Sequence, residues 1–268
     1  MRGVAWLGLP ALLAVAGVSQ ARPHVRKHFE PTDLEFEEPG TTELDLETGF
    51  VRGPDAWRLV APDFELDIGI TRWLELGVDG AYALEGTPGE SFTFDHSAPD
   101  PLWPAAKLGF LDIDDNEAGR SYALGTQIGP KVPTFPSGHG LGFEGVLLAG
   151  ARLGRSDFGF NLGGFVDPAP ADGSRPAGIE SSLAWDHDLD ANGTWSVGGE
   201  LAGVVFTSND PSQLQVAFGP SLAASEWLDL SLTGMLGFVP GGDRYGMVFG
   251  FAPHLPIWKT QPPKGDDD

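Results

Sequence analysis

Acidic side chains recur at every second position in three neighbouring segments near the start of the chain. This group, the acidic ladder, consists of Glu43, Asp45, Glu47, Asp63, Glu65, Asp67, Glu75 and Asp79. Residues two positions apart share one face of a β-strand. Carboxylates grouped on one face repel one another and require water, cations or basic partners close by. The chemistry that this spacing favours is the attraction of cations or polar molecules.

Three basic residues on the polar faces of later segments are candidate partners for the acidic ladder. They are Lys107, Lys131 and Arg152. A negative wall opposite scattered positive charge is compatible with a selective, water-filled passage for solutes. It is equally compatible with a charge network that fills and rigidifies a closed lumen. The sequence leaves both interpretations open.

Two acidic turns, at 112–117 and 186–193, resemble calcium loops only superficially. An EF-hand loop has glycine at its sixth position and glutamate at its twelfth. The two turns have Glu117 and Ala191 at the sixth position instead. We therefore interpret them as polar hairpin turns and predict no metal site.

The remaining polar motifs lack the partners that catalysis or cofactor binding requires. The glycine-rich run 138–142 has neither the strand-to-helix context nor the lysine of a phosphate-binding loop. Ser137 and His139 lie close in sequence, but no third catalytic residue or oxyanion hole is evident. His24 and His28 flank basic residues near the start of the chain. We expect neither enzymatic activity nor a cofactor.

The elements that position these side chains are predicted from strict alternation of apolar and polar residues. For example, Leu74, Leu76 and Val78 alternate with Glu75 and Asp79. A period of two indicates a β-strand, because a helix needs a period near 3.6. Alternating segments occupy 41–51, 57–70, 73–84, 104–112, 120–132, 141–152, 155–166, 176–186, 193–206, 211–222, 225–238 and 243–254. Their length suits tilted strands that cross a membrane, and we predict an all-β, antiparallel transmembrane barrel of about twelve strands.

The connections between these segments alternate in length, as they do in outer-membrane barrels. Tight links near 71–72, 153–154 and 223–224 follow even-numbered segments, whereas the longest link, 85–103, follows an odd-numbered one. We expect both termini in the periplasm, and this parity then puts the tight links on the periplasmic side. Aromatic residues near the segment ends predict an interfacial girdle, formed by Trp57, Trp73, Trp103, Tyr122, Trp185, Trp195, Trp227 and Trp258.

The beginning of the chain has the features of a secretory signal peptide at 1–21, with a positive start, an apolar middle and small residues before the cleavage site. We assign 22–40 to an N-terminal periplasmic segment, 41–258 to the barrel and 259–268 to a polar C-terminal tail.

No later run approaches the roughly 20 apolar residues of a membrane-spanning helix. The formal net charge of −22 argues against nucleic acid as a partner, and the absence of cysteine excludes disulfides.

Several short stretches resemble a family of small outer-membrane proteins assigned to transport in the phenol-degradation (MetA) pathway. They are FELDIGITRWLELGV at 64–78, AKLG at 106–109 and GPKVP at 129–133. The resemblance implies an outer-membrane transporter inserted by the barrel-assembly machinery. The acidic ladder is denser than passage of hydrophobic compounds would require. The chain also ends without an aromatic strand residue, so the strand from Tyr245 to Phe251 would carry the assembly signal.

The sequence therefore predicts a barrel of the cell outer membrane, in contact with outer-membrane lipid. Its predicted function is passive transport of small solutes or cations through an acidic lumen. One alternative is a structural or surface-exposed barrel with a plugged lumen and no transport. A second alternative is a soluble periplasmic β-sandwich that binds a ligand, in which the apolar faces would pack on a second sheet.

Overall fold

The computed structural model describes residues 36–53, 56–86, 97–99, 101–115, 119–134, 140–169, 176–207 and 211–258. The predicted signal peptide (1–21), residues 22–35 of the N-terminal segment and the tail 259–268 lie outside the described residues. The same holds for His24, His28, Ser137 and His139, so the structure does not test the assignments made for them.

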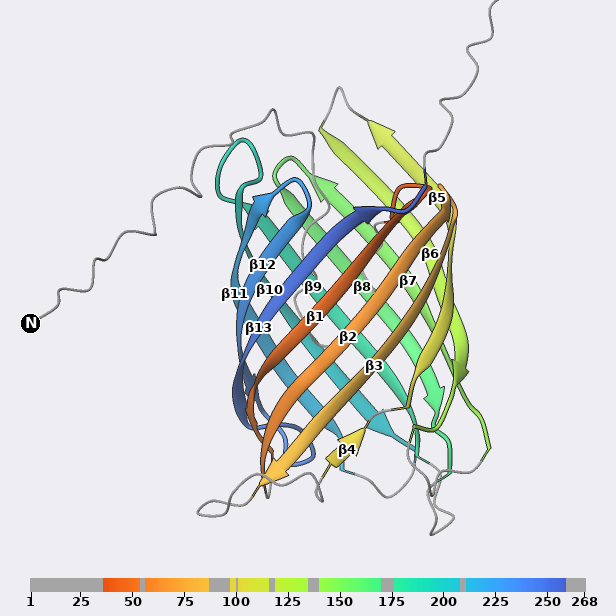
Figure 1. The fold of residues 1–268 in the computed structure, drawn as a ribbon, viewed down its shortest axis with the longest axis vertical. Helices are drawn as coiled ribbons and strands as arrows, with labels where there is room; N and C mark the ends of the chain where they lie inside the picture. The colour runs from red at the N-terminus through yellow and green to blue at the C-terminus, as the bar shows by residue number, and fades with distance from the viewer. Residues whose placement is uncertain are drawn as a thin grey trace, which may run out of the picture.

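Twelve long antiparallel strands and one short strand form a single sheet that closes into a barrel (Figure 1). Alternation of apolar and polar residues along each segment produces these strands, because each strand separates two different environments. The strands are β1 (Thr41–Arg52), β2 (Trp57–Thr71), β3 (Leu74–Gly86), β4 (Ser97–Pro99), β5 (Trp103–Asp115), β6 (Arg120–Lys131), β7 (Gly142–Leu153), β8 (Ser156–Val166), β9 (Ala177–Asp188), β10 (Trp195–Phe206), β11 (Gln213–Ser225), β12 (Leu228–Gly237) and β13 (Tyr245–Pro256).

The barrel closes because the first long strand pairs with the last. In β1 and β13, Thr41 lies opposite Pro256 and Arg52 lies opposite Tyr245. Around the rest of the wall, each long strand pairs with the next long strand along the chain, and β4 adds to the edge of β3. Closure leaves no unpaired edge among the long strands, as the interior of a bilayer requires.

The predicted fold class is confirmed, and the twelve predicted segments match the twelve long strands within a few residues. The β-sandwich alternative is wrong, because the described strands form one closed sheet whose apolar outer face is exposed. The sequence reading missed β4, a three-residue strand in the link between β3 and β5. Within the described residues, no helix is long and apolar enough to cross a bilayer.

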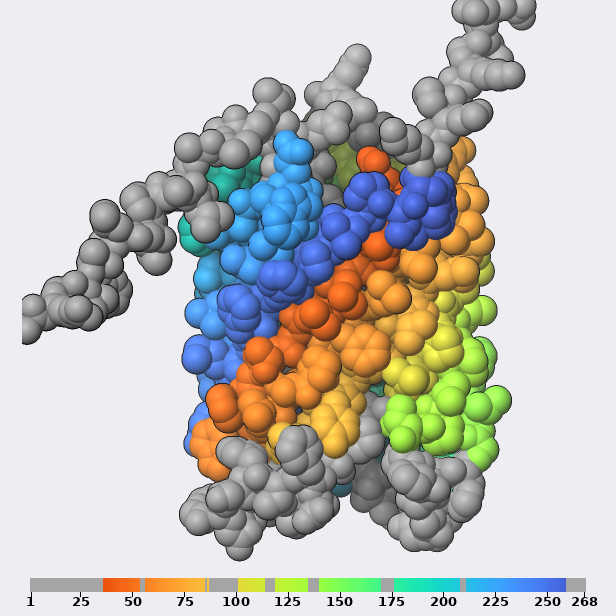
Figure 2. All heavy atoms as spheres, viewed as in Figure 1, coloured from red at the N-terminus to blue at the C-terminus, as the bar shows by residue number. Residues whose placement is uncertain are grey.

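The two faces of the wall have opposite character. The outward face exposes large apolar side chains along the strands, such as Phe50, Leu147 and Phe218. Figure 2 shows β13, β1 and β2 lying side by side as continuous bands across this outer surface. The inward face buries polar groups, among them Glu75 and Thr233. This inside-out distribution is typical of a barrel surrounded by lipid.

The links between strands lie at the two ends of the barrel. We name these ends the terminal rim and the loop rim, according to the strand ends and links that each contains. The terminal rim contains the start of β1, the end of β13 and the short links that follow β2, β5, β7, β9 and β11. The loop rim contains the other links, including the longest, between β3 and β5. In the link after β7, Gly154 adopts a φ of 67°, a conformation that glycine tolerates best. Because the terminal rim holds the short links and the loop rim holds the longest one, the predicted alternation of link lengths is present. The periplasmic location of the terminal rim stays a prediction.

The predicted aromatic girdle is partly correct. At the terminal rim, Trp195, Trp227 and Trp258 are exposed, as interfacial side chains should be. At the loop rim, Trp57 packs edge-to-face on Tyr245, with ring centroids 5.7 Å apart. Trp103 also lies near the loop rim, but it is buried on the inward face opposite Asp79. Its assignment to the girdle is wrong, because alternation places Trp103 on the same face as the inward Lys107.

Candidate functional site

The acidic ladder lies on the inner face of β1, β2 and β3, with carboxylates directly opposite one another across the strand pairs. The opposed pairs are Glu43 with Asp67, Asp45 with Glu65, Glu47 with Asp63, and Glu65 with Asp79. Side chains in such positions have Cβ atoms about 5 Å apart. Two unit charges at that separation repel by about 3 kcal/mol at an effective dielectric constant near 20. The wall therefore strongly favours positive charge in front of it.

Lys107, one of the three predicted basic partners, contacts the acidic ladder. Lys107 on β5 lies opposite Glu75 on β3, and its Nζ is 3.2 Å from Glu75 Oε1. Both side chains are almost completely buried, with exposed fractions of 6% and 3%. The ammonium group also lies 5.4 Å from the ring centroid of Phe36. Lys107 thus compensates the charge of the ladder at the end nearest the terminal rim.

The other two predicted basic residues contact carboxylates on a different part of the wall. Lys131 Nζ on β6 lies 2.7 Å from Glu144 Oε2 and 3.0 Å from Asp167 Oδ1. Arg152 Nε on β7 lies 2.9 Å from Asp157 Oδ1 on β8. These acidic partners were not among the predicted site residues. The pair of Arg152 and Asp157 was detectable in the sequence, because the two residues flank the tight link at Gly154.

The wall formed by β8 to β12 carries hydroxyl and amide side chains together with further carboxylates. Its buried inward side chains include Asn161, Ser182, Ser196, Ser221, Ser231 and Thr233. Ser196 Oγ and Ser221 Oγ are 3.0 Å apart, which is a hydrogen-bond distance. Glu200 is buried on the same wall. Glu180 and Asp186 share the inward face of β9 with Ser182. The lumen therefore carries carboxylates on both sides, and its hydroxyls are concentrated on β8 to β12, the hydroxyl-rich wall.

Apolar side chains cover part of the inner face nearer the loop rim. One cluster contains Trp103, Ala105, Val146 and Leu148, and another contains Val51, Met235 and Val248. All are buried on the inward face, as are other apolar side chains such as Phe165 and Ala217. Packed apolar side chains exclude water from the space that they fill. Near the loop rim, the inner wall therefore combines packed apolar side chains with the ion pairs of Lys131.

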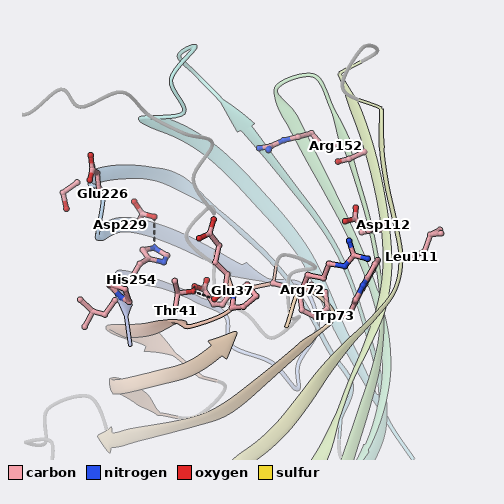
Figure 3. Close-up of a pocket in the computed structure, with 18 residues that line it drawn as sticks. Glu37, Thr41, Arg72, Trp73, Leu111, Asp112, Arg152, Glu226, Asp229 and His254 are labelled. Carbon is pink, nitrogen blue, oxygen red and sulfur yellow. Dashed lines mark hydrogen bonds and ion pairs between the residues drawn. The ribbon is translucent and has the colours of Figure 1, made fainter. Parts of the chain in front are cut away.

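A cavity of about 630 Å³ opens at the terminal rim and is lined by both chain-terminal and wall residues. In Figure 3, Asp229 and His254 lie on one side of this cavity and Asp112 and Arg152 on the other. Residues 36–39 also line it, and they therefore lie within the mouth of the barrel. The backbone N–H of Glu37 donates a hydrogen bond to Glu75 Oε2 at 2.6 Å. This contact ties the N-terminal segment to the acidic ladder.

Four ionisable side chains meet at the edge of this cavity. His254 Nε2 lies 3.1 Å from Asp229 Oδ2 and 3.3 Å from Glu43 Oε1. Glu37 also belongs to this group, because ligand atoms of Glu37, Glu43 and His254 all lie within 4.8 Å of one another. Only Glu43 was among the predicted site residues. No local motif reveals the group, since its members come from the N-terminal segment, β1, β12 and β13.

The acidic turn 186–193 is organised by hydrogen bonds from the backbone. The carboxylate of Asp190 accepts from the N–H groups of Asn192, Thr194 and Trp195, at 2.9, 3.1 and 2.8 Å. Desolvation, the largest single influence, raises the pKa of Asp190. The three hydrogen bonds and the nearby Arg155 together outweigh it and lower the pKa below its ordinary value. This geometry supports the interpretation of the segment as a hairpin turn.

No protein family model matches the chain, and no curated protein matches it. The resemblance to the phenol-degradation family therefore stays a hypothesis. Among solved structures, the chain is similar to the NanC porin, with 8% identity, a TM-score of 0.54, and coverage of 78% of this chain and 97% of that one. The beta domain of the Bordetella autotransporter BrkA matches with 11% identity, a TM-score of 0.44, and coverage of 81% and 99%. An anion-selective porin from Comamonas acidovorans matches with 10% identity, a TM-score of 0.37, and coverage of 80% and 98%. At these identities the likeness to NanC shows the fold alone, which is the closed antiparallel β-barrel of a porin.

Proposed function

We propose that the protein lies in the outer membrane and conducts small cations and polar solutes passively through an acidic lumen. The exposed apolar side chains of the outer face would contact outer-membrane lipid. The terminal rim would face the periplasm after cleavage of the signal peptide at 1–21. Insertion would depend on the barrel-assembly machinery, for which the alternating outward residues Tyr245, Met247 and Phe249 of β13 offer an apolar edge. We propose no catalytic role.

The observation that carries the proposal is the opposition of like charges across β1, β2 and β3. Opposed carboxylates destabilise a sheet, and a purely structural wall would gain stability from neutral side chains at these positions. Glu47 and Glu65, both members of opposed pairs, are nevertheless buried on the inner face. A lumen that admits cations relieves the repulsion whenever a cation is present. The concentration of carboxylates on one inner wall therefore supports a role in attracting cations.

The hydroxyl-rich wall supports passage of polar rather than hydrophobic compounds. Serine and threonine hydroxyls both donate and accept hydrogen bonds, so they can replace water around a polar solute. Ser196 and Ser221 already form one such hydroxyl pair. We therefore propose small cations and polar solutes as the substrate class. Aromatic hydrocarbons of the kind implied by the phenol-degradation resemblance fit this polar lumen less well.

The test is ion selectivity in planar bilayers containing the refolded mature chain. A unit charge about 6 Å from the lumen axis contributes about 0.7 kcal/mol in water, which raises local cation concentration about threefold. Removing two charges in Glu65→Gln/Asp67→Asn should therefore lower the ratio of cation to anion permeability by about tenfold or more. The matched control Asp190→Asn removes a carboxylate from a turn outside the lumen and should leave selectivity unchanged. Equal selectivity in all three proteins would refute the acidic pathway.

The packed apolar clusters near the loop rim favour a second candidate function. In a structural barrel, Trp103, Val146 and Leu148 would seal the lumen and the ion pairs would rigidify its wall. The same bilayer experiment separates the two candidates. A folded barrel that inserts into the membrane without conductance steps would exclude the open channel and favour the structural role. Insertion is checked independently by the shift in electrophoretic mobility on heating.

A further inference from the structure

We propose that Glu37, Glu43, Asp229 and His254 form a binding site for a divalent transition-metal ion at the terminal rim. The first observation is geometric. One ligand atom from each of Glu37, Glu43 and His254 lies within 4.8 Å of the others. Asp229 Oδ2 lies 3.1 Å from the same imidazole. A small inward movement of these side chains brings the ligand atoms to the spacing found around a metal ion bound at about 2.0 to 2.2 Å.

The second observation is the unsatisfied hydrogen-bonding capacity of the group. Asp229 has a side chain that is only 4% exposed, and it lines the same cavity as His254. Within the part of the chain that the structure describes, neither Asp229 Oδ1 nor His254 Nδ1 has a hydrogen-bond partner. Buried carboxylate oxygens and ring nitrogens rarely remain without partners, because their desolvation is costly. A bound cation would satisfy such atoms.

The charge of the group also favours a divalent cation. Three carboxylates surround one imidazole, so the four side chains carry a net charge of −2 even when the imidazole is protonated. Burying this net negative charge costs free energy unless positive charge lies nearby. Across the cavity, the cationic side chains of Arg72 and Arg152 line other parts of the wall (Figure 3), and Arg152 pairs with Asp157. A divalent ion would neutralise the group locally.

The type of ligand selects the type of metal. Calcium takes six to eight oxygen ligands, whereas an imidazole together with carboxylates suits zinc and its neighbours in the first transition series. The position of the site adds a structural consequence. Glu37 belongs to the N-terminal segment, Glu43 to β1, Asp229 to β12 and His254 to β13. A metal ion there would join the N-terminal segment to the strands at which the barrel closes.

The direct test is calorimetric titration of the refolded mature chain with Zn²⁺ alone, in metal-free buffer and detergent. We expect saturable binding of one ion per barrel. His254→Gln and Asp229→Asn should each weaken binding at least about tenfold, since removal of a coordinating or orienting group typically has this effect. Two matched controls should keep the wild-type affinity. His187→Gln removes a histidine that contacts Ser156 on β8, and Asp112→Asn removes a carboxylate on the far side of the cavity.

A second measurement keeps the proposal testable if a variant fails to fold. Co²⁺ bound to wild-type protein should give visible absorption bands of a site with nitrogen and oxygen ligands, and Zn²⁺ should displace it. Zn²⁺ should also protect His254, but not His187, from diethylpyrocarbonate, as read by peptide mass spectrometry. The proposal is overturned if wild-type protein shows no saturable Zn²⁺ binding. It is equally overturned if Zn²⁺ binds without protecting His254, because diffuse binding along the acidic ladder would then explain the titration. Neither result depends on whether the barrel conducts.

Discussion

Replacing Lys107 by methionine should destabilise the barrel strongly, because it leaves Glu75 buried without its ion-pair partner. Lys107 Nζ and Glu75 Oε1 are 3.2 Å apart, and both side chains are at least nine-tenths buried. At that distance and an effective dielectric constant near 20, the Coulomb attraction is about 5 kcal/mol. Removal of one member of a buried pair typically costs 3 to 5 kcal/mol. We expect Lys107→Met to lower the free energy of unfolding by about that amount.

The assay is equilibrium urea unfolding in lipid vesicles, followed by tryptophan fluorescence. The double variant Glu75→Gln/Lys107→Met should recover at least half of the loss, because a neutral pair leaves no uncompensated charge and glutamine still accepts the hydrogen bond from Glu37. The matched control is Arg152→Met. Its pair with Asp157 is about one-third exposed, so solvent screening should limit the cost to about 1 kcal/mol. The reasoning fails if Lys107→Met is no more costly than Arg152→Met, or if the double variant is as unstable as the single one.

Three further predictions follow from the wall, the lumen and the turns. Leu147→Arg, on the lipid-facing middle of β7, should cost about 2 to 4 kcal/mol, whereas Leu153→Arg at the end of the same strand should cost about 1 kcal/mol or less. Equal costs in vesicle unfolding would contradict the membrane orientation. Trp103→Ala should increase single-channel conductance, because it removes the largest side chain of an inward apolar cluster; an unchanged conductance would show that this cluster does not limit the pathway. Asp190→Asn should destabilise the turn after β9. Because the folded-state pKa of Asp190 is lowered, the wild-type advantage in unfolding free energy should be complete above its ordinary value of 3.8 and should disappear as pH falls through the lower folded-state value; an advantage independent of pH would refute this account.

The strands and their two faces could be predicted from the sequence because both depend on a period of two. Alternation in 74–79, for example, places Glu75 and Asp79 together on the inward face that the structure shows. The same rule would have placed Trp103 inward with Ala105 and Lys107. Trp103 also lies at a strand end, where interfacial aromatic residues cluster, and this position accounts for the incorrect girdle assignment.

The partners of individual charged residues were harder to predict, because they depend on register and on closure of the sheet. Lys107 meets Glu75 only because β3 pairs with β5 across the long link that contains β4. The group around His254 requires β13 to pair with both β12 and β1. Some of these contacts join residues more than two hundred positions apart. Local spacing carries no information about such contacts, and the sequence reading therefore missed Glu37, Asp229 and His254.

The pairing of β1 with β13 makes the barrel a candidate for circular permutation. Thr41 and Pro256 lie directly opposite each other at the terminal rim, so a short flexible peptide is long enough to connect them. New chain ends at the tight link between β7 and β8 would then leave all twelve pairings of the wall available. Such a rearranged chain would be translated with the charged pair of Arg152 and Asp157 split between its two ends. Its folding would reveal whether the order in which strands are synthesised matters for closure, or whether the pairing pattern alone is sufficient.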